Sequence, residues 1–289
     1  MLNIGIFRSR GNLGGAVLAW WFLTSRLSAQ GFVLVDAGSA RTAALGGAAV
    51  ALGSNPWSVV ANPAGLADSS SVMAAVGMRP AMYGLTELRV LALGLTWASE
   101  EWGVGCVITR MGGDLFLDQA VALGGGAVIT PEVIAGAGAT VREMRFERYG
   151  GIRFWTLSLG LLIKVADNAM VGSVAENPTR NWIVRGLERA PTRLRAGAAF
   201  APVGTVTLSA EVEKEVGFSP TIKGGLEKRF LGILSVRAGM TTDPDTYSGG
   251  VGVSIGSFQA GVALSYHADL GWTELFELQY LWLNGGNEE

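Results

Sequence analysis

Charged residues are scarce in this sequence: Asp, Glu, Lys and Arg make up 16 % of its 289 residues, against about 25 % in an average soluble protein. One cysteine and one histidine are present, which excludes a disulfide framework and a metal site built on Cys and His. The net charge of -2 disfavours a nucleic-acid partner. Long hydrophobic runs are also missing. The longest, Leu13–Leu23 and Ala43–Gly53, span 11 residues each, whereas a membrane-spanning helix needs about 18.

Two properties are present in excess, glycine and hydropathy. The chain contains 42 glycines, and its mean hydropathy is +0.35. A hydrophobic chain without a spanning helix has one other way to cross a bilayer, because backbone polar groups in lipid must all be hydrogen-bonded internally. That alternative is a closed β-barrel. We therefore predict an all-β fold, a transmembrane antiparallel up-and-down barrel.

Residues 1–29 have the layout of a secretory signal peptide. Arg8 and Arg10 precede the apolar run Leu13–Leu23, and the small residues Ser28 and Ala29 offer a cleavage site after Ala29. A short buried N-terminal helix is the alternative. Export of a chain with one cysteine fits a Gram-negative envelope, and we expect the bacterial outer membrane as its location.

Apolar and polar or small residues alternate with a period of two over residues 69–283, the expected barrel, before a polar tail at 284–289. In 272–283, for example, Phe276, Leu278 and Tyr280 alternate with Glu277 and Gln279. The second face is small rather than charged, as expected for a crowded lumen inside a lipid-facing wall. The pattern predicts about fourteen strands: 70–81, 87–98, 102–110, 116–128, 133–143, 155–166, 169–177, 193–201, 205–215, 220–229, 232–241, 248–256, 258–267 and 272–283.

The lengths of the connections and the positions of the aromatic residues support a barrel independently of the alternating pattern within the strands. Short turns are expected to alternate with longer outer loops, chiefly 144–154, 178–192 and 242–247. Aromatic residues such as Trp97, Trp102 and Trp272 fall near strand ends. They predict two girdles at the membrane surfaces, although β-propensity alone also enriches aromatic residues in strands.

Residues 30–68 precede the barrel and contain few charges. Alanine favours helix, and two Asn-Pro pairs predict turns. Because so apolar a segment is costly to expose, we expect a short helical plug in the barrel lumen rather than a free tether.

Residues 39–67 resemble the opening of the PorV/PorQ family of outer-membrane proteins, which is related in architecture to the FadL-type transporters. The likeness rests on Arg41, on Leu45–Ala48 and on Asn62–Leu66. It implies a fourteen-stranded barrel whose N-terminal segment lies in the lumen. The residues that define this plug motif are Arg41, Gly46, Gly47, Asn62, Pro63, Ala64 and Gly65.

Charges of both signs fall on the small-residue face of the predicted strands. They are Lys164, Arg193, Arg195, Glu211, Glu213, Lys223, Glu227, Arg237 and Glu277. A mutually paired ladder is favoured over a selective charged pore, because unpaired buried charges are costly. A plugged and paired lumen predicts low ion conductance.

No grouping of residues predicts an enzyme, and we expect no cofactor or metal. The outer loop 178–192 combines Trp182, Arg185 and Arg189, a composition typical of a partner-binding patch. A solvated loop whose arginines contact lipopolysaccharide phosphates explains it equally well.

Two functions remain open. The resemblance implies a component of type IX-like protein secretion or surface attachment, with secretion proteins or secreted cargo as partners. The alternative is a FadL-like transporter of hydrophobic small molecules. An unpaired strand edge beside the plug would favour the transporter, and an intact wall would favour the secretion role. Either protein would contact outer-membrane lipid and lipopolysaccharide.

Overall fold

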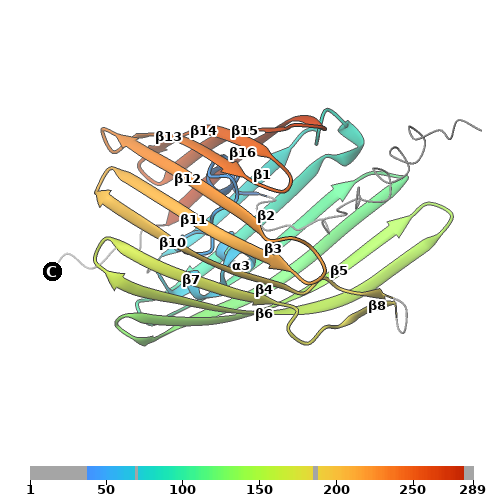
Figure 1. Cartoon of the computed structure of the whole chain (residues 1–289), viewed down its shortest axis with the longest axis horizontal. Helices are drawn as coiled ribbons and strands as arrows, with labels where there is room; N and C mark the ends of the chain where they lie inside the picture. The colour runs from blue at the N-terminus through green and yellow to red at the C-terminus, as the bar shows by residue number, and fades with distance from the viewer. Residues whose placement is uncertain (1–37, 69–70, 185–187, 283–289) are drawn as a thin grey trace, which may run out of the picture. The chain divides into compact units, whose positions relative to one another are not determined.

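The computed structural model describes residues 38–68, 71–184 and 188–282. Fourteen antiparallel strands form a closed barrel in which each strand pairs with its neighbours in sequence order, and β1 pairs with β16 to close the wall (Figure 1). This confirms the predicted fold class and strand number. None of the helices in the described ranges has the length and apolarity that crossing a bilayer requires.

The strand bounds follow the predicted ranges closely. The first seven barrel strands are β1 Val72–Arg79, β2 Val90–Ala98, β3 Trp102–Gly112, β4 Phe116–Thr130, β5 Val133–Phe146, β6 Gly150–Ala166 and β7 Ala169–Glu176. The other seven are β10 Arg193–Val203, β11 Val206–Glu215, β12 Thr221–Phe230, β13 Leu234–Thr241, β14 Thr246–Ile255, β15 Phe258–His267 and β16 Gly271–Trp282. A separate hairpin of β8 Trp182–Val184 and β9 Glu188–Arg189 lies between β7 and β10.

We call the barrel end with connections 99–101, 131–132, 167–168, 204–205, 231–233 and 256–257 the turn end, and the opposite end the loop end. The predicted alternation of short and long connections is wrong in detail. At the loop end only 80–89 and 177–192 are long, while 113–115, 147–149 and 268–270 are as short as turns.

The predicted loop at 144–154 is likewise wrong, because β5 and β6 continue to Phe146 and from Gly150. Polar residues at the end of a strand interrupt an apolar pattern without ending the hydrogen-bonded ladder.

The two faces of the wall differ as the alternation predicts. On β2, Leu91, Leu93 and Leu95 are exposed on the outer face, whereas Ala92 and Thr96 are buried inside. Outward aromatic rings gather at both ends of the wall. Trp97 contacts Trp102 at the turn end, and Tyr266 contacts Trp272 at the loop end, with ring centroids 5.4 and 5.0 Å apart.

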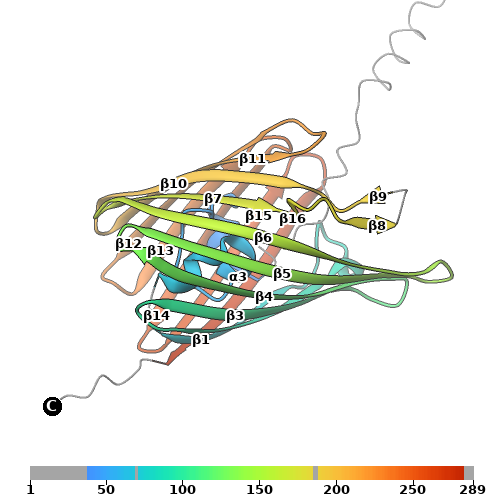
Figure 2. The ribbon, with the colours of Figure 1, turned by 90° about the horizontal axis from the view of Figure 1, so that it is seen from below.

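The plug occupies the lumen. It contains α2 Ala40–Ala44, α3 Ser58–Ala61 and the 3₁₀ helix η2 Pro63–Ala67, and most of its described residues are buried. Figure 2 shows α3 enclosed by the strands. Another short 3₁₀ helix, η3 Thr86–Leu88, lies in the 80–89 connection. The expected signal peptide, residues 30–37 and the polar tail lie outside the described residues.

Candidate functional site in the barrel lumen

Glycines on the inner face of the wall leave the space that the plug occupies. In twelve of the fourteen barrel strands, an added Cβ at one such glycine would lie within 3.1 Å of a plug atom. At Gly160 the distance to Asn62 Oδ1 would be 2.1 Å, and at Gly172 the distance to the Val50 carbonyl oxygen would be 2.2 Å. The twelve glycines are Gly77, Gly94, Gly105, Gly126, Gly136, Gly160, Gly172, Gly197, Gly225, Gly239, Gly250 and Gly261. Much of the glycine excess therefore has a structural reason, since no larger residue fits at these positions.

The two remaining strands, β11 and β16, contribute glutamates that bind the plug backbone. Glu211 Oε2 accepts hydrogen bonds from the Ala49 and Val50 amides at 2.9 and 2.8 Å. Glu277 Oε2 accepts one from the Ala40 amide at 2.8 Å, and its other oxygen accepts one from the Trp57 indole. Both side chains are buried. A buried carboxylate is costly unless it is hydrogen-bonded, and here the plug supplies the donors.

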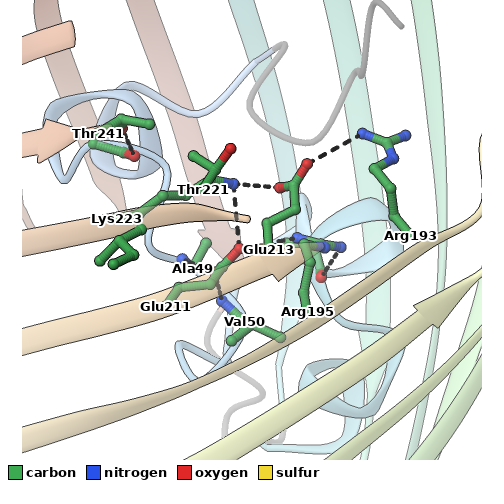
Figure 3. Close-up of polar contacts among 12 residues, drawn as sticks. Ala49, Val50, Arg193, Arg195, Glu211, Glu213, Thr221, Lys223 and Thr241 are labelled. Carbon is green, nitrogen blue, oxygen red and sulfur yellow. Dashed lines mark hydrogen bonds and ion pairs between the residues drawn. The ribbon is translucent and has the colours of Figure 1, made fainter. Parts of the chain in front are cut away.

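A cluster of charges around Glu211 connects β7, β10, β11 and β12 (Figure 3). Lys223 Nζ lies 3.3 Å from Glu211 and 2.5 Å from Glu213. Arg195 Nη2 donates to the Ala61 carbonyl at 2.6 Å. Its side chain is fully buried. The wall charges therefore hold both amides and carbonyls of the plug.

Glu176 at the end of β7 completes this cluster. Its carboxylate lies 2.6 Å from Arg195 and 3.0 Å from Arg193. Glu176 was not among the predicted lumenal charges, although its alternation with Gly172 and Val174 places it on the inner face. A strand-parity count over 169–177 is the signal that could have found it.

A second cluster forms around Glu227 on β12. Arg41 of the plug and Arg237 of β13 both donate to its carboxylate, at 3.0 and 2.7 Å. The structure thus brings eight of the nine predicted lumenal charges into contact with the plug or with one another. Lys164 lies apart, half-exposed at the turn end, where it pairs with Asp167 at 2.9 Å. That exposed pair contributes little to stability.

Another buried pair on the inner face, Asp118 with Arg142, was not predicted. It joins β4 to β5, and the Asp118 side chain is 1 % exposed. Both residues share the parity of the inward glycines Gly126 and Gly136. The weak pattern of the glycine-rich strand β4 concealed this pair.

The plug motif builds the turns of the plug. The Asn62 side chain donates to the carbonyls of Val50 and Leu161, and its Oδ1 accepts from the Ala64 amide. Gly65 donates to the Asn62 carbonyl within η2, which begins at Pro63. Asn62 therefore caps one helix while it fixes the plug to itself and to β6.

Gly46 and Gly47 both have positive φ, +66° and +80°. A Cβ on Gly46 would lie 2.5 Å from the Met240 carbonyl oxygen. The chain turns at these two glycines directly after α2. Glycine adopts the left-handed conformation required there without steric cost.

Beside β1–β4 the plug itself meets apolar side chains instead of charges; Asp118 of β4 lies nearer the loop end, opposite Met111 in register. Trp57, Val59 and Leu66 of the plug pack against Val107 and other side chains of the wall. The same buried cluster continues towards the loop end and includes Ala75, Met82, Val90, Ala92, Met111 and Ala122. An apolar lining therefore joins the 80–89 connection to the plug, with the Asp118–Arg142 pair beside Met111 towards the loop end.

The 80–89 connection folds onto the loop end of the barrel. Met82 is buried in the apolar cluster, and the Tyr83 amide donates to Thr273 Oγ1 at 3.1 Å. The Tyr83 ring lies edge-on to His267, whose Nδ1 accepts from the Asp269 amide. His267 is thus a hydrogen-bonded residue at the loop end of the inner face.

The wall is continuous beside the plug. Three shifts in strand register occur in the described barrel strands, between Val128 and Thr130, Lys164 and Ala166, and Phe200 and Val203. Each lies next to a turn at the turn end.

Of the predicted partner loop, Arg185 lies outside the described residues. Trp182 begins β8, and Arg189 ends β9 and is exposed. The hairpin pairs Trp182 with Arg189 in backbone register, at the loop end beside β6.

Comparison with known proteins gives matches in structure alone. No family model matches the sequence, and neither does any curated protein. Among solved structures, the CymD monoaromatic hydrocarbon channel is similar with a TM-score of 0.65 at 12 % identity, over 86 % of this chain and 98 % of that one. The Ralstonia pickettii toluene transporter TbuX gives 0.61 at 13 % identity, over 84 % and 98 %.

A Pseudomonas aeruginosa FadL homologue gives a TM-score of 0.62 at 10 % identity, over 85 % of this chain and 98 % of that one. The chain thus has the fold of FadL-like barrels.

Proposed function

We propose that this chain is a bacterial outer-membrane channel for hydrophobic small molecules, in which the plug controls passage. The outer face of the wall supports the location, because large apolar side chains cover it and aromatic rings gather at both ends. Such a surface is stable in lipid and costly in water.

The observation that carries the transport proposal is the apolar lining between the 80–89 connection and the plug. Met82, Met111 and Val107 belong to this buried cluster, which also contains Trp57 of the plug. An apolar solute is stabilised along such a lining by about 25 cal/mol for each Å² of its surface that is removed from water. An ion pays a desolvation cost beside these apolar side chains.

The comparisons support the same proposal. The similar structures are a hydrocarbon channel, a toluene transporter and a FadL homologue. The secretion role that residues 39–67 implied finds no support among them. An intact wall is the feature expected of the secretion role, and the wall beside the plug is continuous. The similar structures favour transport instead, and the continuous wall does not favour a lateral exit. We therefore propose a route that runs along the barrel axis, past the apolar side of the plug.

Uptake of radiolabelled toluene by cells that lack other hydrocarbon channels tests the proposal. Cells with the chain should accumulate toluene several-fold faster than cells with an empty vector. Ala122→Phe, on the inner face of β4, should abolish the gain by filling the lining, and Ala127→Phe, on the outer face of the same strand, should preserve it. Heat-modifiable electrophoretic mobility checks that each variant folds. A folded wild-type barrel without any gain in uptake would refute the proposal.

A further inference from the structure

The outer face of the wall carries a depression over β7 and β10. Three small side chains, those of Ser173, Ala175 and Ala196, point outwards there. Ser173 lies opposite Ala196 in register, and Ala175 lies opposite the larger Leu194. The strands on either side present larger outward residues, Leu161 on β6 and Val212 on β11. This difference in side-chain size leaves an open hollow of about 540 Å³, which we call the trough.

Larger residues bound the trough at both ends. Towards the turn end, Val171 and Phe200 project outwards and are 39 % and 43 % exposed. Towards the loop end, the trough is lined by Leu194 and by Lys214 of β11. Apart from Ser173 and Lys214, the outward side chains that line it are apolar. A narrow apolar depression with one cation at one end matches a molecule with a hydrocarbon chain and an anionic group.

The position of Lys214 indicates which part of a bilayer it meets. It lies eight residues along β11 from Val206, which at about 3.3 Å per residue and a tilt of about 40° is roughly 20 Å above the turn end. The apolar band of such barrels is about 25 Å tall. A lysine ammonium at this height reaches the headgroup region through its flexible alkyl stem.

We propose that the trough binds one acyl chain of a phosphate-bearing lipid in the leaflet at the loop end, with Lys214 against the phosphate. The proposal rests on the membrane location given above and is independent of the transported solute. Lipid that is held in a depression of matching size loses contact with the protein more slowly than lipid on the rest of the wall.

Native mass spectrometry of the full barrel in detergent, titrated with dimyristoyl phosphatidic acid, tests the trough. The wild type should retain one lipid. Ala175→Leu combined with Ala196→Leu fills the trough and should lower occupancy at least fivefold. The matched control, Ala238→Leu with Ala260→Leu, adds the same volume to the outer face of β13 and β15, away from the trough, and should leave occupancy unchanged.

A second titration tests the cation. Lys214→Gln should reduce the preference for phosphatidic acid over dimyristoyl glycerol about fivefold, because the glycerolipid lacks the phosphate. Lys228→Gln removes an outward cation near the turn end, next to Thr205, and should preserve that preference. Inorganic phosphate alone should not compete, because the acyl chain supplies most of the contact.

Three results would overturn the proposal. One is equal lipid retention by the filled and wild-type barrels. Another is a dimer of the chain that disappears when the trough is filled, since a second copy would then be the occupant. The third is full competition by inorganic phosphate. A barrel that inserts into membranes and retains lipid but transports no toluene would refute the proposed transport alone.

Discussion

Glu211 is the residue whose removal should most affect the docking of the plug. Its Oε2 accepts hydrogen bonds from two plug amides, Ala49 and Val50, and the carboxylate also lies 3.3 Å from Lys223. A hydrogen bond to a charged group is worth about 1.5–3 kcal/mol. Glu211→Ala removes two such bonds and leaves the amides buried, so the free energy of local opening at these residues should fall by about 3–6 kcal/mol.

Amide hydrogen exchange measured by mass spectrometry on peptides that cover residues 45–52 reports this opening directly. Since about 1.4 kcal/mol corresponds to a factor of ten, exchange should accelerate about 10²- to 10⁴-fold in the variant. Glu213→Ala is the matched control. Glu213 lies two residues along the same strand and pairs with Lys223 and Arg193 of the wall, and its removal should change exchange less than tenfold. Equal exchange in the two variants would refute the reasoning.

Three further outcomes are expected. In planar bilayers the wild-type barrel should conduct ions poorly, because the plug fills the lumen and the charges that face the lumen are paired. Large, steady open-channel currents would contradict this. Gly136→Ala should lower the thermal stability of the folded barrel, since the new Cβ would lie 2.3 Å from plug backbone, whereas Gly224→Ala, with nothing within 4 Å, should not. In urea titrations Asp118→Asn should cost about 1.5–3 kcal/mol, because it removes the charge from the buried acceptor of Arg142, which is itself 17 % exposed. Glu143→Gln, which breaks ion pairs with the exposed Arg145 and Arg153, should cost much less, and equal losses would show that burial does not decide the difference.

The sequence predicts the strands well because lipid imposes a simple rule. Most outward side chains within the apolar band of such a barrel are apolar, with exceptions such as Ser173, so the period of two is visible along nearly every strand. The rule ends where the band ends. Glu143 and Arg153 face outwards near the loop end of β5 and β6 and are opposite each other in register. The predicted loop 144–154 begins directly after Glu143 and includes Arg153, although β5 continues to Phe146 and β6 begins at Gly150.

The partners of the inward charges are harder to predict than their direction. Parity alone places Glu211 and Glu277 in the lumen, but it pairs them with other charges rather than with backbone. Their actual donors, the amides of Ala49 and Ala40, depend on the path of a plug that has no periodic pattern. Lys164 shows the converse. It has inward parity but lies at the turn end, where water and Asp167 are accessible.

Hydrogen bonds and ion pairs hold the plug on one side, and apolar packing holds it on the other. This difference indicates which side a solute would displace first. The hydrogen bonds described between plug and wall involve Glu211, Arg195, Glu227, Glu277 and other groups on β6, β10–β14 and β16. Beside β1–β4 the described contacts are apolar packing and glycine close approach. Breaking a buried charged contact costs several kcal/mol because it leaves unpaired groups, whereas apolar packing can be replaced by an apolar solute at little net cost. A hydrophobic solute would therefore displace the plug on the side of β1–β4 first, while the charged side keeps it in the lumen.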